Sequence, residues 1–236
     1  MQLPTQSAPE YSAVLPLTKV EVKFRPFLVK EQRNMLLVKE DSDTKSMFNT
    51  LITMLKSVML SDNVKIENLP MTDIEFLFLQ VRSKSVGETQ ELTLPCVKED
   101  CDGRRVGTMD MSNINVDTTE RDESNIIELN EDLSIELELP SATKMVSIAD
   151  LSEDKLLNAI LLLSMTKIYD KENIYDLKDH RDSEIQEFID NMSVEQFNSV
   201  SRFFSKIPTI SVELKTVCQK CKHKHEESIS GFANFF

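Results

Sequence analysis

Four cysteines in two close pairs, separated by a long stretch of chain, constrain this sequence more than any other feature. Cys96 and Cys101 form a C-x4-C pair, and Cys218 and Cys221 form a C-x2-C pair, each between strand-like arms. Tight turns of this kind supply thiolates to tetrahedral zinc, and two such turns complete its coordination. The 116 residues between the pairs far exceed the roughly 12 to 20 of ordinary zinc motifs. A shared site therefore requires the residues between the pairs to form an insertion.

Other interpretations of the cysteines stay open. They could be reduced structural residues at two separate hairpin turns, or they could take part in disulfide or redox chemistry. Close pairs in a reducing cytosol are more often metal ligands than disulfides. A redox C-x2-C pair should open a helix after a strand, whereas Cys218 lies in a strand–turn context. We predict a structural zinc ion whose ligands are Cys96, Cys101, Cys218 and Cys221.

The three histidines are not expected to extend this site. His223 and His225 lie two residues apart on an expected strand, directly beyond Cys221, where the geometry for ligation is awkward. His180 lies in a charged segment with no nucleophile near it in the sequence. We expect all three side chains to be solvated.

Hydrophobic periodicity switches along the chain between a strand pattern and a helix pattern. Apolar residues alternate with charged ones at 18–28, and they recur every three or four residues at 47–59, which are the periods of a half-buried strand and of an amphipathic helix. The order of strand, helices, strands, helices and strands predicts an α+β fold. Its helical blocks flank two β-hairpin cysteine knuckles that could form a zinc-ribbon-like element. The predicted segments are a flexible arm at 1–17, a strand plus helical region at 18–90, a β region with the first cysteine pair at 91–141, a helical region at 142–207 and a C-terminal β-hairpin with the second pair at 208–236.

Two capping boxes mark expected helix starts. Thr72 with Glu75 and Ser193 with Gln196 have the spacing at which each side chain satisfies a free backbone N–H of the first turn. The expected helices span about 29–40, 47–59, 72–81, 152–169, 181–190 and 193–206.

Composition and charge exclude several function classes. The 236 residues include 40 acidic and 27 basic side chains, and the resulting net charge of −13 disfavours bulk binding to nucleic acid. Only four glycines are present, and no phosphate-binding or hydrolase motif occurs. The first 17 residues lack the basic and apolar regions of a secretory signal, so we do not expect them to act as one. The longest apolar run, Ala159–Leu163, is far shorter than the ~20 residues of a membrane span. We expect a soluble intracellular protein with no catalytic activity, no small-molecule substrate and no membrane contact.

Charge is also distributed unevenly along the chain. Residues 117–140 include nine acidic and one basic residue, whereas residues 202–225 include six basic and one acidic residue. The acidic run is interpreted as a solvated face. The basic run flanks the second cysteine pair, and a basic zinc knuckle can contact nucleic acid. The alternative function is therefore a zinc-knuckle nucleic-acid-binding regulator. Because no exposed aromatic platform accompanies this knuckle, an acidic protein partner or simple solubility is the preferred explanation.

Three stretches of the chain are distinctive. They are FRPFLVKEQRNMLLV at 24–38, TDIEFLFLQVRSKSVGE at 72–88 and the terminal C-x2-C followed by GFANFF. Together and in this order they resemble the baseplate hub subunit family of T-even-type contractile-tailed bacteriophages. The resemblance implies a non-enzymatic tail protein needed to build the central hub of the baseplate, as a structural piece or as an assembly chaperone. It further implies other hub and tail proteins as partners, the host cytoplasm as the place of assembly, and the virion baseplate as the location of a structural piece.

The family assigns none of the matching residues a catalytic role. Arg82 and Lys84 near a helix end complement its dipole, and Gly87 permits the turn out of the helix. The resemblance implies a C-x2-C spacing followed by glycine in the first knuckle, whereas this chain has C-x4-C with Gly103 two residues later. The matching positions are Arg25, Pro26, Phe27, Lys30 and Glu31 in the first motif and Asp73, Glu75, Arg82, Lys84, Ser85, Gly87 and Glu88 in the second.

Overall fold

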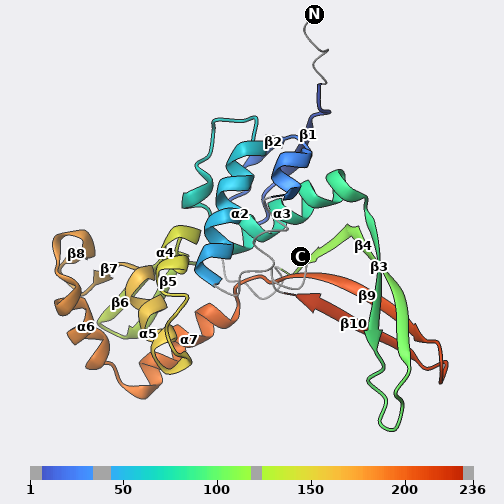
Figure 1. Cartoon of the computed structure of the whole chain (residues 1–236). Helices are drawn as coiled ribbons and strands as arrows, with labels where there is room; N and C mark the ends of the chain where they lie inside the picture. The colour runs from blue at the N-terminus through green and yellow to red at the C-terminus, as the bar shows by residue number, and fades with distance from the viewer. Residues whose placement is uncertain (1–6, 34–43, 118–123, 231–236) are drawn as a thin grey trace, which may run out of the picture. The chain divides into compact units, whose positions relative to one another are not determined.

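The computed structural model describes residues 7–33, 44–117 and 124–230. The chain divides into two compact units (Figure 1). Met1–Asp117 and Thr209–Phe236 form the first unit, and Thr118–Pro208 forms the second. The second unit is therefore an insertion within the first, as a site shared by both cysteine pairs requires. Helices and antiparallel sheets occur together, which confirms the predicted α+β class.

A four-stranded antiparallel sheet in the order β10-β9-β4-β3 carries both cysteine pairs. Strands β4 and β9 are neighbours although the inserted unit separates them in the sequence. They share a buried apolar face that includes Met109, Met111, Val212 and Leu214. The β3–β4 loop and the β9–β10 loop open at the same end of the sheet, because Arg105 of β4 pairs with Cys218 of β9. The strands are β3 (Thr89–Pro95), β4 (Arg104–Val116), β9 (Ile210–Cys218) and β10 (Lys224–Ser230).

The first unit also contains a two-stranded hairpin and two long helices. The carboxylate of the buried Asp73 accepts hydrogen bonds from the backbone N–H groups of Leu17 (2.8 Å) and Thr18 (3.0 Å). This contact fixes the turn of the hairpin to the start of α3. Strand β1 lies inside the segment predicted as a flexible arm, and it pairs with β2 along its whole length. The elements are β1 (Tyr11–Val14), β2 (Glu21–Phe24), α2 (Thr44–Val58), the 3-10 helix η1 (Ile66–Asn68) and α3 (Met71–Val86).

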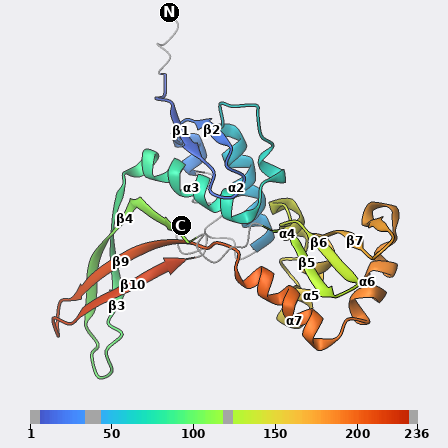
Figure 2. The same cartoon turned by 180° about the vertical axis from the view of Figure 1, so that it is seen from behind.

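The inserted unit has a core of its own. Its antiparallel sheet has the order β5-β6-β7-β8, and helices α5, α6 and α7 surround this sheet (Figure 2). Ile135, Leu137, Leu161, Ile185 and Val200 belong to a single buried cluster that joins strand to helix. The elements are β5 (Ile126–Asn130), β6 (Leu133–Leu137), α4 (Ala142–Ser147), α5 (Glu153–Ser164), β7 (Met165–Tyr169), β8 (Ile174–Asp176), the 3-10 helix η2 (Leu177–Asp179), α6 (Asp182–Asp190) and α7 (Val194–Ser205).

The helix predicted at 152–169 is too long. The structure ends it at Ser164, and the following five residues form β7 instead. Thr166, Ile168 and Tyr169 favour a pleated strand because they are β-branched or aromatic, and β7 pairs with β6 on one side and β8 on the other. Tertiary pairing therefore overrides the apolar helix pattern that precedes it.

The predicted helix starts have different outcomes. Ser193 and Gln196 form the predicted capping box at the start of α7. Helix α3 begins one residue before Thr72, with Pro70 in the N-cap position, so the predicted capping box at its start is wrong. Of the helix expected at 29–40, residues 29–33 are helical and the rest lies outside the described residues. In the described part of the chain, every helix is too short or too polar to cross a membrane.

Candidate metal centre

The first cysteine loop is folded by backbone hydrogen bonds across the end of the β3–β4 hairpin. The N–H of Cys96 donates to the carbonyl of Gly103 at 2.9 Å, and the N–H of Cys101 donates to the carbonyl of Lys98 at 3.2 Å. Asp100, directly before the second cysteine, adopts a left-handed backbone conformation with φ of 62°. These features turn both thiols of the C-x4-C pair toward the same point.

The second cysteine loop repeats this design at the end of the β9–β10 hairpin. The N–H of Cys218 donates to the carbonyl of His223 at 2.9 Å, and the N–H of Lys222 donates to the carbonyl of Cys218 at 3.0 Å. Lys222, directly after the second cysteine, has a φ of 59°. A further hydrogen bond, from Gln219 N–H to the carbonyl of Arg104 at 2.8 Å, joins this loop to the first.

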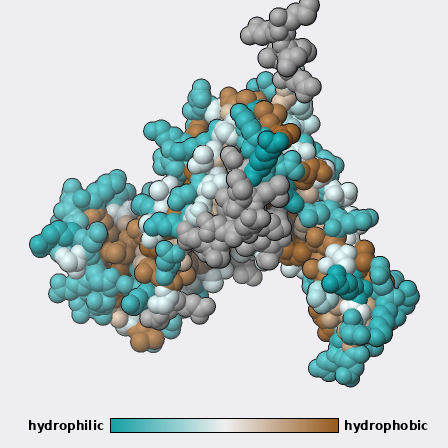
Figure 3. Space-filling view, viewed as in Figure 1, coloured by the Kyte–Doolittle hydropathy of each residue, from teal (hydrophilic) through white to brown (hydrophobic). Residues whose placement is uncertain are grey.

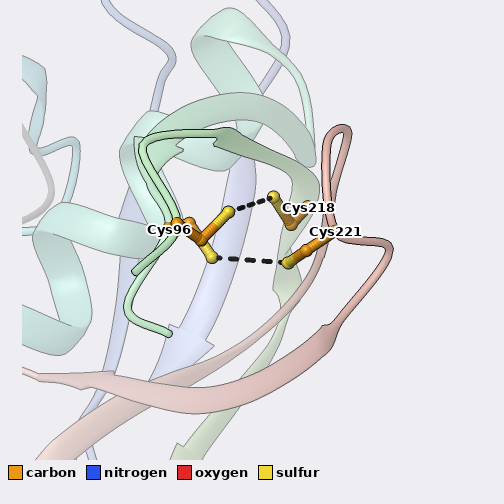
Figure 4. Close-up of side chains that lie close together, drawn as sticks. Cys96, Cys218 and Cys221 are labelled. Carbon is orange, nitrogen blue, oxygen red and sulfur yellow. Dashed lines mark hydrogen bonds between the residues drawn. The ribbon is translucent and has the colours of Figure 1, made fainter. Parts of the chain in front are cut away.

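The two loops bring all four predicted cysteines together. Cys96 faces Cys218 and Cys221 from across the gap between the loops (Figure 4). The Sγ atoms of Cys96 and Cys221 are 3.8 Å apart, as are those of Cys101 and Cys218, and all four lie within 4.8 Å of one another. Four sulfurs at ~2.3 Å from a tetrahedral zinc ion would lie about 3.8 Å apart. The cysteines are free thiols, and their spacing matches a metal site and exceeds a disulfide bond, which is ~2.05 Å long.

Gly103 gives the cluster its compactness. A Cβ atom at this position would lie 2.7 Å from Lys220 Cβ, 2.8 Å from Cys218 Sγ and 3.2 Å from Cys101 Sγ. Real Cβ atoms essentially never approach other heavy atoms below 3.0 Å. Any larger residue would therefore push the two loops apart.

Backbone amides and the neighbouring thiols set the acidity of the cluster. The backbone N–H of Cys221 lowers the pKa of Cys218 to about 6, with help from the N–H of Lys220 and against the opposing effect of burial. At Cys96 the N–H of Lys98 also favours the thiolate, but burial and hydrogen bonds with the neighbouring thiols outweigh it and raise the pKa to about 11. The thiolate is the form of cysteine that binds a metal ion. The lowered pKa of Cys218 favours this form at neutral pH.

Arg105 of β4 pairs in register with Cys218 of β9. Its structural role next to the cysteines was not predicted from the sequence. Arg105 is 6% exposed, and its guanidinium donates to the carbonyl of Pro95 on β3 at 3.0 Å, to Thr216 Oγ1 on β9 at 3.4 Å and to Glu227 on β10 at 2.8 Å. One side chain from β4 therefore joins all four strands at the end of the sheet that carries the cysteines. The sequence offers no signal for this role, because the contacts depend on strand register.

Two of the three histidines are exposed, as predicted. His223 is exposed, and His180 lies on the inserted unit, where its Nδ1 is 3.6 Å from the carboxylate of Glu184. His225 is less solvated than predicted, because its Nε2 lies 3.7 Å from Cys96 Sγ. Burial lowers the pKa of His225, and the neighbouring His223 adds to this effect. The neutral imidazole is thus favoured beside the thiols.

Comparison with known proteins gives the chain a family. The model of a family described as T4 bacteriophage base plate protein matches residues 8–236. The chain belongs to this family. The match spans nearly all of the sequence and confirms the resemblance to T-even-type baseplate proteins. No curated protein and no solved structure matches the chain.

The resembling motifs of this baseplate protein make structural contacts. The Arg25 guanidinium forms an ion pair with the buried Glu31 at 3.0 Å. The backbone N–H of Phe27 donates to Ser85 Oγ at 2.8 Å, which joins the first motif to the second. Lys84 pairs with Glu88, which lies just beyond the end of α3. These contacts hold the N-terminal hairpin, α3 and the start of β3 together.

Charges around the cysteine loops are balanced between the two signs. Lys215 of the basic run lies 4.0 Å from the carboxylates of both Glu213 and Glu226, and Lys220 pairs with Asp102 across the two loops. The tips of the loops form a hydrophilic surface (Figure 3). Because carboxylates lie among its cations, this surface is poorly suited to a phosphate backbone. A nucleic-acid-binding function thus gains no support from the described residues.

Proposed function

We propose that this baseplate protein takes part in building the central hub of the baseplate, as a structural piece or as an assembly chaperone, through protein–protein contacts and without catalysis. The family match over residues 8–236 carries the proposal. The motifs of the resemblance support it, because their residues make packing and hydrogen-bonding contacts within the first unit. Its partners are other hub and tail proteins, which it meets in the host cytoplasm during assembly.

We also propose that the four cysteines bind one structural zinc ion. The sulfur spacing of the two loops supports this assignment, because it fits a tetrahedron of thiolates before any ion is added. Four thiolates fill the coordination of zinc and leave no position for water or a substrate. The ion would then cross-link residues near position 96 to the C-terminal hairpin and have no catalytic role. Metal analysis of the purified chain tests this directly, since a thiolate tetrahedron also suits iron.

Copy number in the phage particle tests the hub function. Quantitative mass spectrometry would count this chain relative to known baseplate proteins in purified virions and in infected-cell lysate. A few copies per virion would identify a structural piece of the hub. Abundance in lysate, co-purification with hub precursors and absence from virions would identify an assembly chaperone. A chain that is absent from virions and does not accompany hub precursors in lysate would refute the proposal.

A further inference from the structure

The inserted unit has an open sheet edge beside an apolar groove. Strand β5 is the first strand of its sheet and pairs only with β6 among the described strands. A groove of about 240 Å³ lies next to it, and its apolar walls come from Ile126 and Ile127 of β5, from Phe203 of α7 and from Ile207. The side chain of Ile126 is 48% exposed. An edge strand with an exposed apolar residue is a template for pairing with another chain.

Two cationic side chains line the groove, although the inserted unit as a whole has an excess of acidic residues. Residues 118–208 include 20 acidic and nine basic side chains, yet Arg202 and Lys206 both line the groove. Several other cations of the unit have carboxylate partners, including Lys167 with Glu136 and Arg181 with Glu184. Arg202 is exposed, and the one polar contact of its guanidinium in the described part of the chain is with Ser199 Oγ at 3.5 Å.

We propose that this groove binds an extended segment of another baseplate protein in which apolar and acidic residues alternate, and that the segment adds a strand to the edge of β5. The backbone of β5 would supply main-chain hydrogen bonds, as in other cases of strand addition. An apolar side chain would enter the groove, and the next outward carboxylate would meet Arg202, whose planar guanidinium suits carboxylates. Side chains of the unit itself contact this edge of β5. Ser124 Oγ donates to the carbonyl of Ile126 and accepts from its N–H, both at 3.2 Å, and Gln196 Nε2 contacts the carbonyl of Leu129 at 3.4 Å. The added strand would replace these side-chain contacts with main-chain hydrogen bonds.

The chemistry of the groove argues for this partner against others. A nucleic acid would bring many phosphates to a unit with an excess of 11 acidic residues, and two cations are too few to offset that repulsion. The positive charge of Arg202 would repel a basic segment in the groove. An acidic segment gains from Arg202, and the net negative charge of the unit disfavours its binding at most other places on this unit. The identity of the partner as a baseplate protein rests on the proposed function; the binding chemistry does not.

Synthetic peptides test the groove on the full chain. Three capped, fluorescently labelled heptapeptides alternate valine with glutamate, glutamine or lysine, and fluorescence anisotropy measures their binding. We expect the glutamate peptide to bind best, the glutamine peptide roughly fivefold more weakly, as for an exposed ion pair, and the lysine peptide not at all. Arg202→Gln should weaken the glutamate peptide about fivefold and leave the glutamine peptide unchanged. Arg181→Gln, which removes one positive charge elsewhere on the same unit, should change neither.

A second pair of peptides tests strand addition itself. N-methyl groups on alternate residues block hydrogen bonding along one edge of a strand, so methylation of one edge should abolish binding and methylation of the other should preserve it. Equal binding of both methylated peptides would overturn the strand geometry. Equal binding of the glutamate and lysine peptides, or no binding of any peptide, would overturn the proposal. Self-association that Arg202→Gln abolishes, measured by sedimentation, would assign the groove to a second copy of this chain and overturn the proposed partner. None of these results depends on the copy number in virions, so failure here leaves the hub function standing.

Discussion

If the four cysteines bind the proposed zinc ion, its removal should loosen the first unit and leave the inserted unit unchanged. The cysteine cluster joins β3–β4 to β9–β10, and both hairpins belong to the first unit. The inserted unit has its own sheet and its own buried core. A chelator should therefore lower the melting temperature of one thermal transition and leave a second one in place. The variant Cys218→Ser, which removes a fully buried ligand, should show the lowered transition without any chelator.

The size of the effect follows from the length of chain that the metal closes. Cys101 and Cys218 are 117 residues apart, and a cross-link over such a loop stabilises the fold by about 5 kcal/mol through the entropy of the unfolded chain. If the inserted unit stays folded, only about 25 flexible residues remain in the loop, and the contribution falls to about 3.5 kcal/mol. At the size of the first unit, 1 kcal/mol corresponds to roughly 2 to 4 °C. The first transition should thus fall by roughly 7 to 20 °C.

Differential scanning calorimetry with and without EDTA measures this shift, and elemental analysis of the same samples measures zinc. The wild-type chain should hold about one zinc ion and respond to EDTA, whereas Cys218→Ser should hold none and be indifferent to it. The EDTA-induced shift of the wild-type chain measures the effect of metal loss alone. Any additional destabilisation of Cys218→Ser measures the cost of placing a serine in a buried site. Equal melting of the wild-type chain with and without EDTA, or a shift confined to the inserted unit, would refute the reasoning.

Three further predictions concern single residues. Gly103→Ala should lower the zinc-to-protein ratio, because the added Cβ would lie only 2.8 Å from Cys218 Sγ and would crowd Cys101 Sγ at 3.2 Å. The control variant Gly87→Ala has a φ of 106° but open space around it. It should cost about 1 kcal/mol of stability and leave the zinc content unchanged. Burial opposes ionisation of Glu31, but the Arg25 guanidinium and the backbone N–H of Leu28 together outweigh it and lower the carboxyl pKa from its ordinary value of 4.5. Its contribution to stability is therefore present above about pH 4.5 and lost as the pH falls through the folded-state pKa. Glu31→Gln should cost about 2 kcal/mol in urea unfolding at pH 7, with a gap from wild type that closes in acid. Arg105→Lys keeps the charge but loses the planar fork, and it should lower the urea midpoint by the equivalent of about 2 kcal/mol; an unchanged midpoint would show that the four-strand network contributes little.

The cysteine cluster could be predicted from the sequence because its chemistry is rare and local. Two close thiol pairs at expected turns have few uses, and the spacing alone required an insertion between them. Arg105 could not be predicted in this way. A basic residue in a strand usually faces solvent, and only the register of β4, β9 and β10 places Thr216 and Glu227 beside it. The end of the helix predicted at 152–169 was missed for a related reason, since no glycine or proline interrupts the sequence where α5 gives way to β7.

The position of the insertion gives a reason why the proposed zinc ion would stabilise the far end of the same two strands. Strands β4 and β9 pair from Arg105 with Cys218 at one end to Val116 with Ile210 at the other, and the inserted unit leaves the sheet at the second end. Bringing together strands separated by about 90 residues costs roughly 4 kcal/mol of chain entropy if those residues are flexible. A folded insertion reduces this entropy cost at the Val116–Ile210 end of the strand pair. A zinc ion held by both cysteine loops would reduce the remaining conformational freedom at the Arg105–Cys218 end. The two closures act on the same strand pair, so loss of metal should matter most when the inserted unit is also destabilised.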